Sequence, residues 1–326
     1  MKIGALEVKT NVFPAPLAGI SDRAFRDLTR EFGAELTFTE MISSEGLFRG
    51  DKNTTKLLDI ENEPGPVSVQ LFGNNPDSFA KAAVKLNSMN VQAIDINMGC
   101  PVKKVVNNSS GSGLMTQPQK AEQIVRAVKA NTKLPLTVKI RSGWDAKTIN
   151  AVEFSQMIEE AGADAIIVHP RTRAQQFRDK SDWSIIKAVK DTVKIPVIGN
   201  GDILKPSDGY KMIQETNCDG IMIGRGILGN PWLFANVIRA INGENLEILD
   251  QFFPSRNDRA DIIWKHANIL AKCKGERFGL LEMRKHAIWY IKGLNNARTL
   301  RFELGQMVTL EFLKNVLDYI RDDDGD

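Results

Sequence analysis

Short apolar runs rich in β-branched residues recur from Val12 to Gly224, with helical periodicity in the segments between them. Each run is too continuously apolar for a half-exposed antiparallel strand, so we expect parallel strands that are buried on both faces. Apolar spacing over Pro118–Ala130 and Val152–Ala161 predicts two of the intervening helices, the second ending before Gly162. The expected strands are Val12–Pro16, Leu36–Glu40, Val67–Leu71, Ala93–Asn97, Leu136–Ile140, Ala165–His169, Pro196–Asn200 and Gly220–Gly224.

Eight strand–helix units favour an α/β fold of the (β/α)8 TIM-barrel type, with an open doubly wound sheet as the alternative. Most of these strands end in a polar side chain, and barrel enzymes place their chemistry at strand ends. The alternation stops after residue 241, and residues 255–321 show helical periodicity only. We therefore predict a catalytic barrel over residues 1–241 and an all-α helical bundle domain over residues 242–326, ending in an acidic tail.

The composition is that of an ordinary soluble globular chain, with 326 residues, 42% hydrophobic and 25% charged. No apolar run reaches the roughly 18–20 residues that a membrane span needs. Three widely spaced cysteines predict reduced thiols and a cytoplasmic location, and no CxxC or HExxH spacing indicates a metal site. We expect no membrane association, no metal and a monomer.

Charge is unevenly distributed, although the net charge of +3 is too small to indicate a polyanionic partner. Residues 256–301 carry 11 Lys/Arg and 4 Asp/Glu, a local excess of +7. Residues 302–326 carry 2 basic and 7 acidic residues, a local excess of −5. On charge alone the basic stretch is either a solvated helical surface or a surface for an anionic partner.

The decapeptide 95–104 holds the strongest chemical signal. Cys100 stands between Gly99 and Pro101 just beyond a predicted strand, and a glycine–proline turn holds a side chain at a fixed place. Lys103 and Lys104 follow, so an anion could bind nearby. Spacing alone leaves two interpretations of Cys100 open: a reactive thiol and a small buried core residue.

Glycine-rich loops after the seventh and eighth strands predict a phosphate site. Residues 199–202 read Gly-Asn-Gly-Asp and residues 224–226 read Gly-Arg-Gly, which lets backbone N–H groups approach an anion closely. Lys139, pointing into the barrel mouth, is either a cation beside a flat ring such as a flavin, a Schiff-base lysine, or a solvated rim residue. His169 could contact the phosphate or the ring, or could simply be packed.

The chain resembles the tRNA-dihydrouridine synthases over almost its whole length, and most closely their bacterial B-type branch. The similar segments are 15–22 (Ala-Pro-Leu-Ala-Gly-Ile-Ser-Asp), 69–70, 95–104, 137–141, 169–172, 199–203, 220–234, 284–286 and 289–290. The resemblance implies an FMN-binding barrel, NADPH as the reductant, tRNA as the partner, and a helical domain that engages the tRNA. The implied reaction reduces the C5–C6 bond of a uridine in the D-loop, at position 17 for the B-type branch.

The resemblance also implies roles for individual residues. Flavin N5 would deliver hydride to C6, and the Cys100 thiol would protonate C5, so this thiol must remain protonated. Asn97 would hold the uracil edge. The implied cofactor-binding residues are Pro16, Leu17, Ala18, Gln70, Lys139, His169, Asn200, Gly201, Asp202, Gly224 and Arg225. The implied substrate-binding residues are Asn97, Lys103, Lys104, Arg171, Arg284 and Lys285.

Three other functions compete with this one. An FMN barrel oxidoreductase acting on a free pyrimidine would share the phosphate loops but would not need the basic helical segment. A lyase using Lys139 as a Schiff base would need no flavin. A non-catalytic RNA-binding protein would keep the basic segment but would have no use for Cys100.

Overall fold

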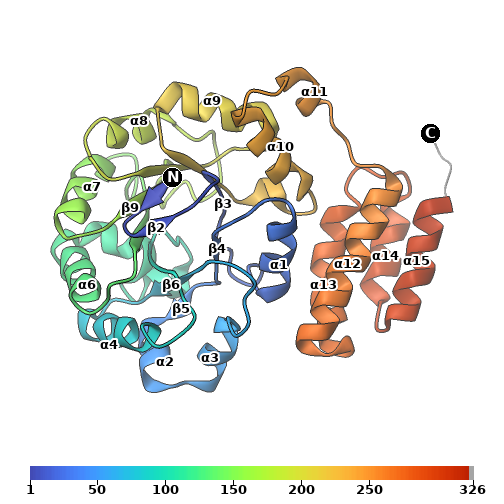
Figure 1. Ribbon diagram of the computed structural model, residues 1–326, viewed down its shortest axis with the longest axis horizontal. Coiled ribbons are helices and arrows are strands. Elements are labelled where there is room, and N and C mark those ends of the chain that lie inside the picture. The colour runs from blue at the N-terminus through green and yellow to red at the C-terminus, as the bar shows by residue number, and fades with distance from the viewer. Residues whose placement is uncertain (323–326) are drawn as a thin grey trace.

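The computed structural model describes residues 1–322, and most of its strands form one parallel sheet around a central axis (Figure 1). The strands are β3 (Val12–Pro14), β4 (Thr37–Phe38), β6 (Val67–Phe72), β7 (Ala93–Met98), β8 (Leu136–Arg141), β9 (Ala165–His169), β10 (Val197–Asn200) and β11 (Gly220–Ile223). Within the described residues they pair in parallel in the order β3-β11-β10-β9-β8-β7-β6-β4. Because β3 and β4 also contact each other, the barrel is nearly closed. The predicted TIM barrel is confirmed and the open doubly wound sheet is excluded.

Helices surround the barrel, as Figure 1 shows. The two helices predicted individually are confirmed: α6 covers Pro118–Ala130, and α7 covers Ala151–Glu160 and is followed by Gly162 with φ of +106°. Within residues 1–322 no helix is long and apolar enough to cross a membrane. The other helices around the barrel are α1 (Arg23–Glu31), α2 (Ser44–Arg49), α3 (Lys52–Leu58), α4 (Pro76–Leu86), α5 (Lys103–Val106), α8 (Ser184–Lys190), α9 (Pro206–Thr216), α10 (Trp232–Ile241) and α11 (Leu246–Asp250).

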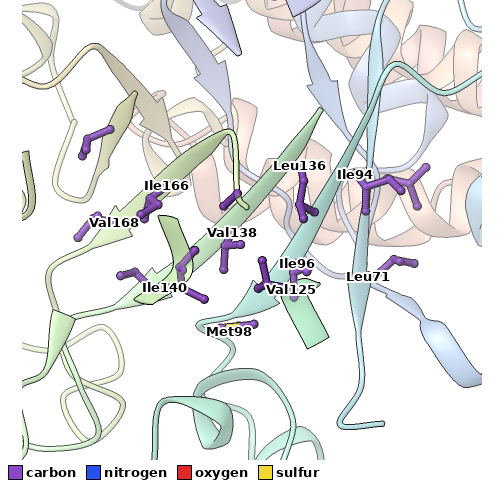
Figure 2. Close-up of a cluster of buried hydrophobic side chains, with 14 of the residues drawn as sticks. Leu71, Ile94, Ile96, Met98, Val125, Leu136, Val138, Ile140, Ile166 and Val168 are labelled. Carbon is purple, nitrogen blue, oxygen red and sulfur yellow. The ribbon is translucent and has the colours of Figure 1, made fainter. Parts of the chain in front are cut away.

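One face of each barrel strand packs against the surrounding helices. On β7, Ile94, Ile96 and Met98 belong to an apolar cluster that also contains Val125 of α6 (Figure 2). Each such side chain contributes about 1.5–3 kcal/mol when it is fully buried. Side chains alternate along a strand, so the residues between these three point into the barrel. The inward positions are therefore free to carry polar chemistry.

The barrel interior is apolar at the end where the strands begin. Phe13, Leu36, Phe38 and Ile198 pack there in one buried cluster. A small antiparallel hairpin, β1 (Lys2–Ile3) and β2 (Leu6–Glu7), adds Ile3 to that cluster and so covers this end. The sequence did not predict this hairpin, because strands of two residues carry no readable periodicity. A further short strand, β5 (Ile42–Ser43), pairs with β6.

A bundle of helices lies beside the barrel, next to α1 (Figure 1). It comprises α12 (Arg256–Lys274), α13 (Glu276–Tyr290), α14 (Ala297–Gln306) and α15 (Leu310–Asp322), which confirms the helical periodicity over residues 255–321. Its apolar cluster includes Ala24 and Leu28 of α1, so the barrel supplies part of the bundle's core. The predicted acidic tail lies, after Asp322, outside the described residues.

Hydrogen bonds attach α11 to the barrel helix α9. Ser207 of α9 donates two hydrogen bonds to the carboxylate of Asp250, from its N–H at 2.9 Å and from its hydroxyl at 2.6 Å. The segment 246–250 is thus bonded to the barrel. We propose that the helical domain starts at Ser255, the N-cap of α12, rather than at residue 242.

Replacing Leu28 by Ala tests how the bundle is attached. We expect the free energy of unfolding to fall by about 2–5 kcal/mol, because the substitution leaves a cavity where α1 meets the bundle. Urea denaturation followed by circular dichroism measures this loss. Leu281→Ala is the matched control, since Leu281 is 43% exposed on α13 and its truncation should cost under about 0.5 kcal/mol. Equal losses for the two variants would contradict the attachment.

Candidate active site

A cavity of about 300 Å³ opens at the carboxyl ends of the strands. Its volume is at the lower end of the usual range for small-molecule sites. Most of the predicted site residues line it, although they come from segments far apart in the chain. These residues are Pro16, Leu17, Ala18, Gln70, Asn97, Cys100, Lys139, His169, Arg171, Asn200, Gly201, Asp202, Gly224 and Arg225. Lys103, Lys104, Arg284 and Lys285 lie outside the cavity lining.

The register of the strands explains why polar side chains meet above the apolar layer. Asp95 on β7 lies opposite Gln70 on β6 and opposite Thr137 on β8, and Asn97 lies opposite Lys139. In parallel strands, paired residues present their side chains to the same face. All five therefore point into the barrel and can bond to one another.

Asp95 is fully buried and was not among the predicted site residues. Its carboxylate accepts hydrogen bonds from Gln70 Nε2 at 2.6 Å and from the Thr137 hydroxyl at 2.5 Å. Burial raises the pKa of Asp95, and the nearby ammonium of Lys139 opposes that shift. The sequence signal that could have found it is a lone acidic residue inside an apolar strand, since such a residue needs buried donors.

Lys139 is held from the other side of the barrel. Its Nζ donates to Asn200 Oδ1 at 2.6 Å, and Asn200 Nδ2 donates to the Met222 carbonyl at 2.8 Å. Burial lowers the pKa of Lys139, while attraction to Asp95 opposes the shift. The ammonium is thus fixed at the floor of the cavity by β10 and lies in the field of a buried carboxylate.

Cys100 occupies a turn that is anchored at both ends. Asn97 Oδ1 accepts the N–H of Gly99 at 3.1 Å and the N–H of Cys100 at 2.9 Å. On the other side, Ser112 donates to the Cys100 carbonyl from its N–H at 3.1 Å and from its hydroxyl at 2.9 Å. Gly111 is required nearby, because its φ is +58° and a Cβ there would stand 2.8 Å from the Cys100 carbonyl oxygen.

Electrostatics around Cys100 favour the protonated thiol. Burial raises the pKa of the Cys100 thiol, and the positive charge of Arg141 opposes this only in part. Arg141 donates to the Gly99 carbonyl at 2.8 Å and to two carbonyls of the loop after β9, those of Thr172 and Gln176. Arg141 was not among the predicted site residues. The sequence signal that could have found it is an arginine at the end of a strand that is expected to be buried.

Arg171 lines the cavity and makes many contacts within the protein. Its guanidinium bonds both oxygens of Asp202 at 2.8 Å, the Ser181 hydroxyl at 2.8 Å and the carbonyls of Arg178 and Asp179. It is only 3% exposed. A direct substrate contact by Arg171 stays a prediction, but its described bonds position Asp202 and the loop that follows β9.

His169 presents a buried nitrogen with no partner among the described residues. Its Nδ1 makes no hydrogen bond there. A Cβ on Gly201, whose φ is +132°, would stand 3.1 Å from this nitrogen and 2.6 Å from Ser181 Oγ. Burial first, and then the positive charges around it, including Lys139, hold the pKa of His169 well below its usual value, so the ring is neutral. An unpaired nitrogen next to Gly201, where a side chain would not fit, suits a bound group that supplies hydrogen-bonding atoms.

The four predicted substrate residues outside the cavity lining lie in two places. Lys103 and Lys104 are exposed on α5 and directly follow the cavity-lining Pro101 and Val102. Lys285 of α13 donates to the Gly19 carbonyl, so it ties the helical bundle to the loop after β3. Arg284 donates twice to the Met307 carbonyl and caps the end of α14.

The family model for dihydrouridine synthase matches residues 13–322. The chain belongs to the dihydrouridine synthase family. A relative described as probable tRNA-dihydrouridine synthase 1, from Synechocystis sp., is 37% identical over 320 residues, covering 98% of this chain and 88% of the relative. tRNA-dihydrouridine synthase B of Pasteurella multocida is 38% identical over 294 residues, covering 90% and 87%.

Further relatives described as tRNA-dihydrouridine synthase B, from Vibrio parahaemolyticus and Pseudomonas aeruginosa, are 37% and 36% identical over 92% and 94% of this chain. The predicted family and its B-type branch are confirmed. As a dihydrouridine synthase the protein is an oxidoreductase, which leaves the lyase and the non-catalytic RNA-binding protein without support.

Solved structures with the same fold include an old yellow enzyme homologue from Zymomonas mobilis, with a TM-score of 0.54 and 13% identity over 78% of this chain and 98% of that chain. Morphinone reductase gives a TM-score of 0.51 and 11% identity over 76% of this chain and 89% of that chain. At such low identity the likeness shows the fold alone. It agrees with the TIM barrel of this dihydrouridine synthase.

Alkylation of Cys100 tests its electrostatic setting. We expect iodoacetamide to react with Cys100 along a titration curve whose midpoint lies above that of a free cysteine, because only the thiolate is nucleophilic and burial disfavours it. Mass spectrometry of the peptide carrying Cys100, over a pH series, gives the curve, with N-acetylcysteine as the reference. A midpoint below the reference would contradict a protonated thiol.

Proposed function

We propose that the protein is an FMN-dependent, NADPH-linked tRNA-dihydrouridine synthase that reduces the C5–C6 bond of uridine 17 in the D-loop. Membership in the dihydrouridine synthase family supports the reaction, and the relatives described as B-type support the position. The observation that carries the mechanism is one cavity lined by the Cys100 thiol, the Lys139 ammonium and two glycine-rich loops.

The residues present fit FMN. Gly201, Gly224 and Arg225 would hold the phosphate, because small backbone loops and a 52% exposed guanidinium suit an anion. The neutral His169 would pair its free Nδ1 with the cofactor. Pro16, Leu17 and Ala18 would lie against the ring, and Gln70, Lys139 and Asn200 at its polar edge. Asp202, held by Arg171, would shape the phosphate loop.

The reaction adds one hydride and one proton across the C5–C6 bond. When bound, FMN that has been reduced by NADPH supplies the hydride to C6. Cys100 holds the proton at Sγ and releases it to C5, and solvent then returns a proton to the thiolate. Burial keeps the thiol protonated until it acts. The second amide hydrogen of Asn97, whose first is bonded to Gln70, is available to an oxygen of the uracil edge.

The base must leave its stack to enter the cavity, as in other enzymes that act on bases. Lys103 and Lys104, exposed at the cavity rim, would then contact phosphates of the tRNA backbone. We propose that Lys285 acts by holding the loop after β3 in place, and that Arg284 acts by capping α14 within the tRNA-engaging bundle. The cytoplasmic location and the monomeric state remain predictions.

Replacing Cys100 by Ala tests the proton donor. The purified C100A protein should keep its FMN, while its turnover falls roughly 10²- to 10⁴-fold, the usual contribution of a general acid. The assay measures dihydrouridine in unmodified tRNA incubated with NADPH, and sequencing of the product locates it. Cys273→Ala is the matched control, because Cys273 lies on α12, outside the cavity.

Near-normal turnover by C100A would remove Cys100 from the mechanism. Loss of bound FMN would show instead that Cys100 supports the cofactor site. Dihydrouridine at a position other than 17 would contradict the B-type specificity, and activity on free uracil without activity on tRNA would favour the free-pyrimidine enzyme.

Lys103→Ala combined with Lys104→Ala tests the rim contact. We expect weaker tRNA binding and a shallower salt dependence, with the slope of log K against log[salt] reduced by about 1.4 if two phosphates lose their partners. Filter binding over a salt series measures both quantities. Lys133→Ala is the control, because Lys133 is exposed just before β8 begins, at the opposite end of the barrel. An unchanged slope would contradict the contact.

A further inference from the structure

A chain of side-chain hydrogen bonds runs from the buried carboxylate of Asp95 to the backbone of Cys100. Gln70 Nε2 donates to Asp95 at 2.6 Å, and Asn97 Nδ2 donates to Gln70 Oε1 at 2.8 Å. Asn97 Oδ1 in turn accepts the N–H groups of Gly99 and Cys100. The chain therefore joins β6 and β7 to the turn that carries the thiol.

Each of the two side-chain amides in this hydrogen-bonded series can both donate and accept, because its nitrogen donates and its oxygen accepts. Rotation of either amide by half a turn would exchange the positions of its nitrogen and its oxygen. An ionised carboxylate only accepts, so Asp95 requires the nitrogen of Gln70 to face it. The oxygen of Gln70 is then left for Asn97, which must present its own nitrogen. That choice turns the oxygen of Asn97 toward the turn.

At the far end, backbone N–H groups only donate, so they require an oxygen from Asn97. An acceptor at one end and donors at the other make a single orientation of both amides self-consistent. With either amide reversed, two donors or two acceptors would face each other inside the barrel, where an unpaired polar group costs about 1–3 kcal/mol.

We propose that Asp95 is a positioning residue that sets the orientation of Gln70 and Asn97 and thereby fixes the turn carrying Cys100. This inference rests on the proposed function, because it concerns where the proton donor stands. Displacing a reacting group by about 1 Å can cost roughly a hundredfold in rate. Thr137 gives Asp95 its second donor but takes no part in the orientation of the amides.

The test is a double-mutant cycle between residues 95 and 97. With Asn97→Asp alone, carboxylates face both ends of the Gln70 amide, which can satisfy only one of them. Adding Asp95→Asn relieves this conflict, because the Gln70 amide can then rotate by half a turn and donate its nitrogen to the new carboxylate at position 97. The new amide at position 95 can turn its nitrogen toward Gln70 Oε1 and its oxygen toward the Thr137 hydroxyl. A substitution at a buried aspartate should therefore repair damage caused two residues away.

The primary measurement is hydrogen–deuterium exchange of the peptide containing Gly99 and Cys100, by mass spectrometry on the FMN-loaded proteins at about pH 8. N97D should exchange roughly tenfold faster than the wild type, and D95N/N97D should return to within about threefold of it. Thr137→Val combined with N97D is the matched control. It removes a donor to Asp95 but leaves the carboxylate, so it should give no rescue.

The catalytic measurement uses D95N alone, in which the orientation of the amides is no longer imposed. Its kcat for dihydrouridine formation should fall at least roughly tenfold with KM for tRNA unchanged, since the thiol is less well placed. Thr137→Val should retain most of the wild-type kcat.

Additive damage in D95N/N97D, with faster exchange than N97D alone, would overturn the proposal. If N97D does not fold, folding of the double variant is itself the rescue, and failure of both to fold overturns the proposal equally. If the exchange is rescued but the wild-type protein makes no dihydrouridine, the orientation of the amides stands and the proposed function is rejected. If the wild-type protein makes dihydrouridine but the exchange is not rescued, the proposed function stands and the orienting role of Asp95 is rejected.

Discussion

A buried carboxylate that must be satisfied by donors constrains the centre of this protein. Asp95 is fully buried, and two neighbouring strands supply the hydrogen bonds that make its burial tolerable. Those bonds exist only in one register, in which Asp95 lies opposite both Gln70 and Thr137. Since a shift by one residue would turn every side chain to the opposite face, the register that satisfies Asp95 also places Asn97, Lys139 and the thiol turn around one cavity.

The outward face of the strands contributes to stability, and the inward face carries the polar residues of the candidate site. Outward residues such as Ile94, Ile96 and Met98 attach the strands to the helices (Figure 2). Inward residues near the strand ends are polar and are held by one another: Lys139 by Asn200, and Asn97 by Gln70. Within residues 1–322, the apolar layer and the hairpin β1–β2 cover the other end of the barrel, and the polar layer faces the cavity.

The sequence predicted the barrel well, because eight apolar runs separated by helical segments have few other solutions. Most of the named site residues do line one cavity, since side chains at the carboxyl ends of parallel strands lie close together, while their roles stay predictions. It did not predict the roles of Asp95 and Arg141, because their partners come from other strands and loops. The separate contacts of Arg284, Lys285 and Arg171 could not be predicted either, since a basic residue in a motif does not reveal whether its donors are already bonded within the protein.

In the proposed function, this cavity reduces one uridine of tRNA with bound FMN and does not act on a free pyrimidine. The most direct measurement is reoxidation of the pre-reduced protein by substrate, followed through the visible absorbance of the flavin in the absence of oxygen. Unmodified tRNA with uridine at position 17 is predicted to reoxidise the flavin and to gain dihydrouridine. The same tRNA with cytidine at position 17 should leave the flavin reduced. Equal reoxidation by both tRNAs, or by free uracil alone, would contradict the account.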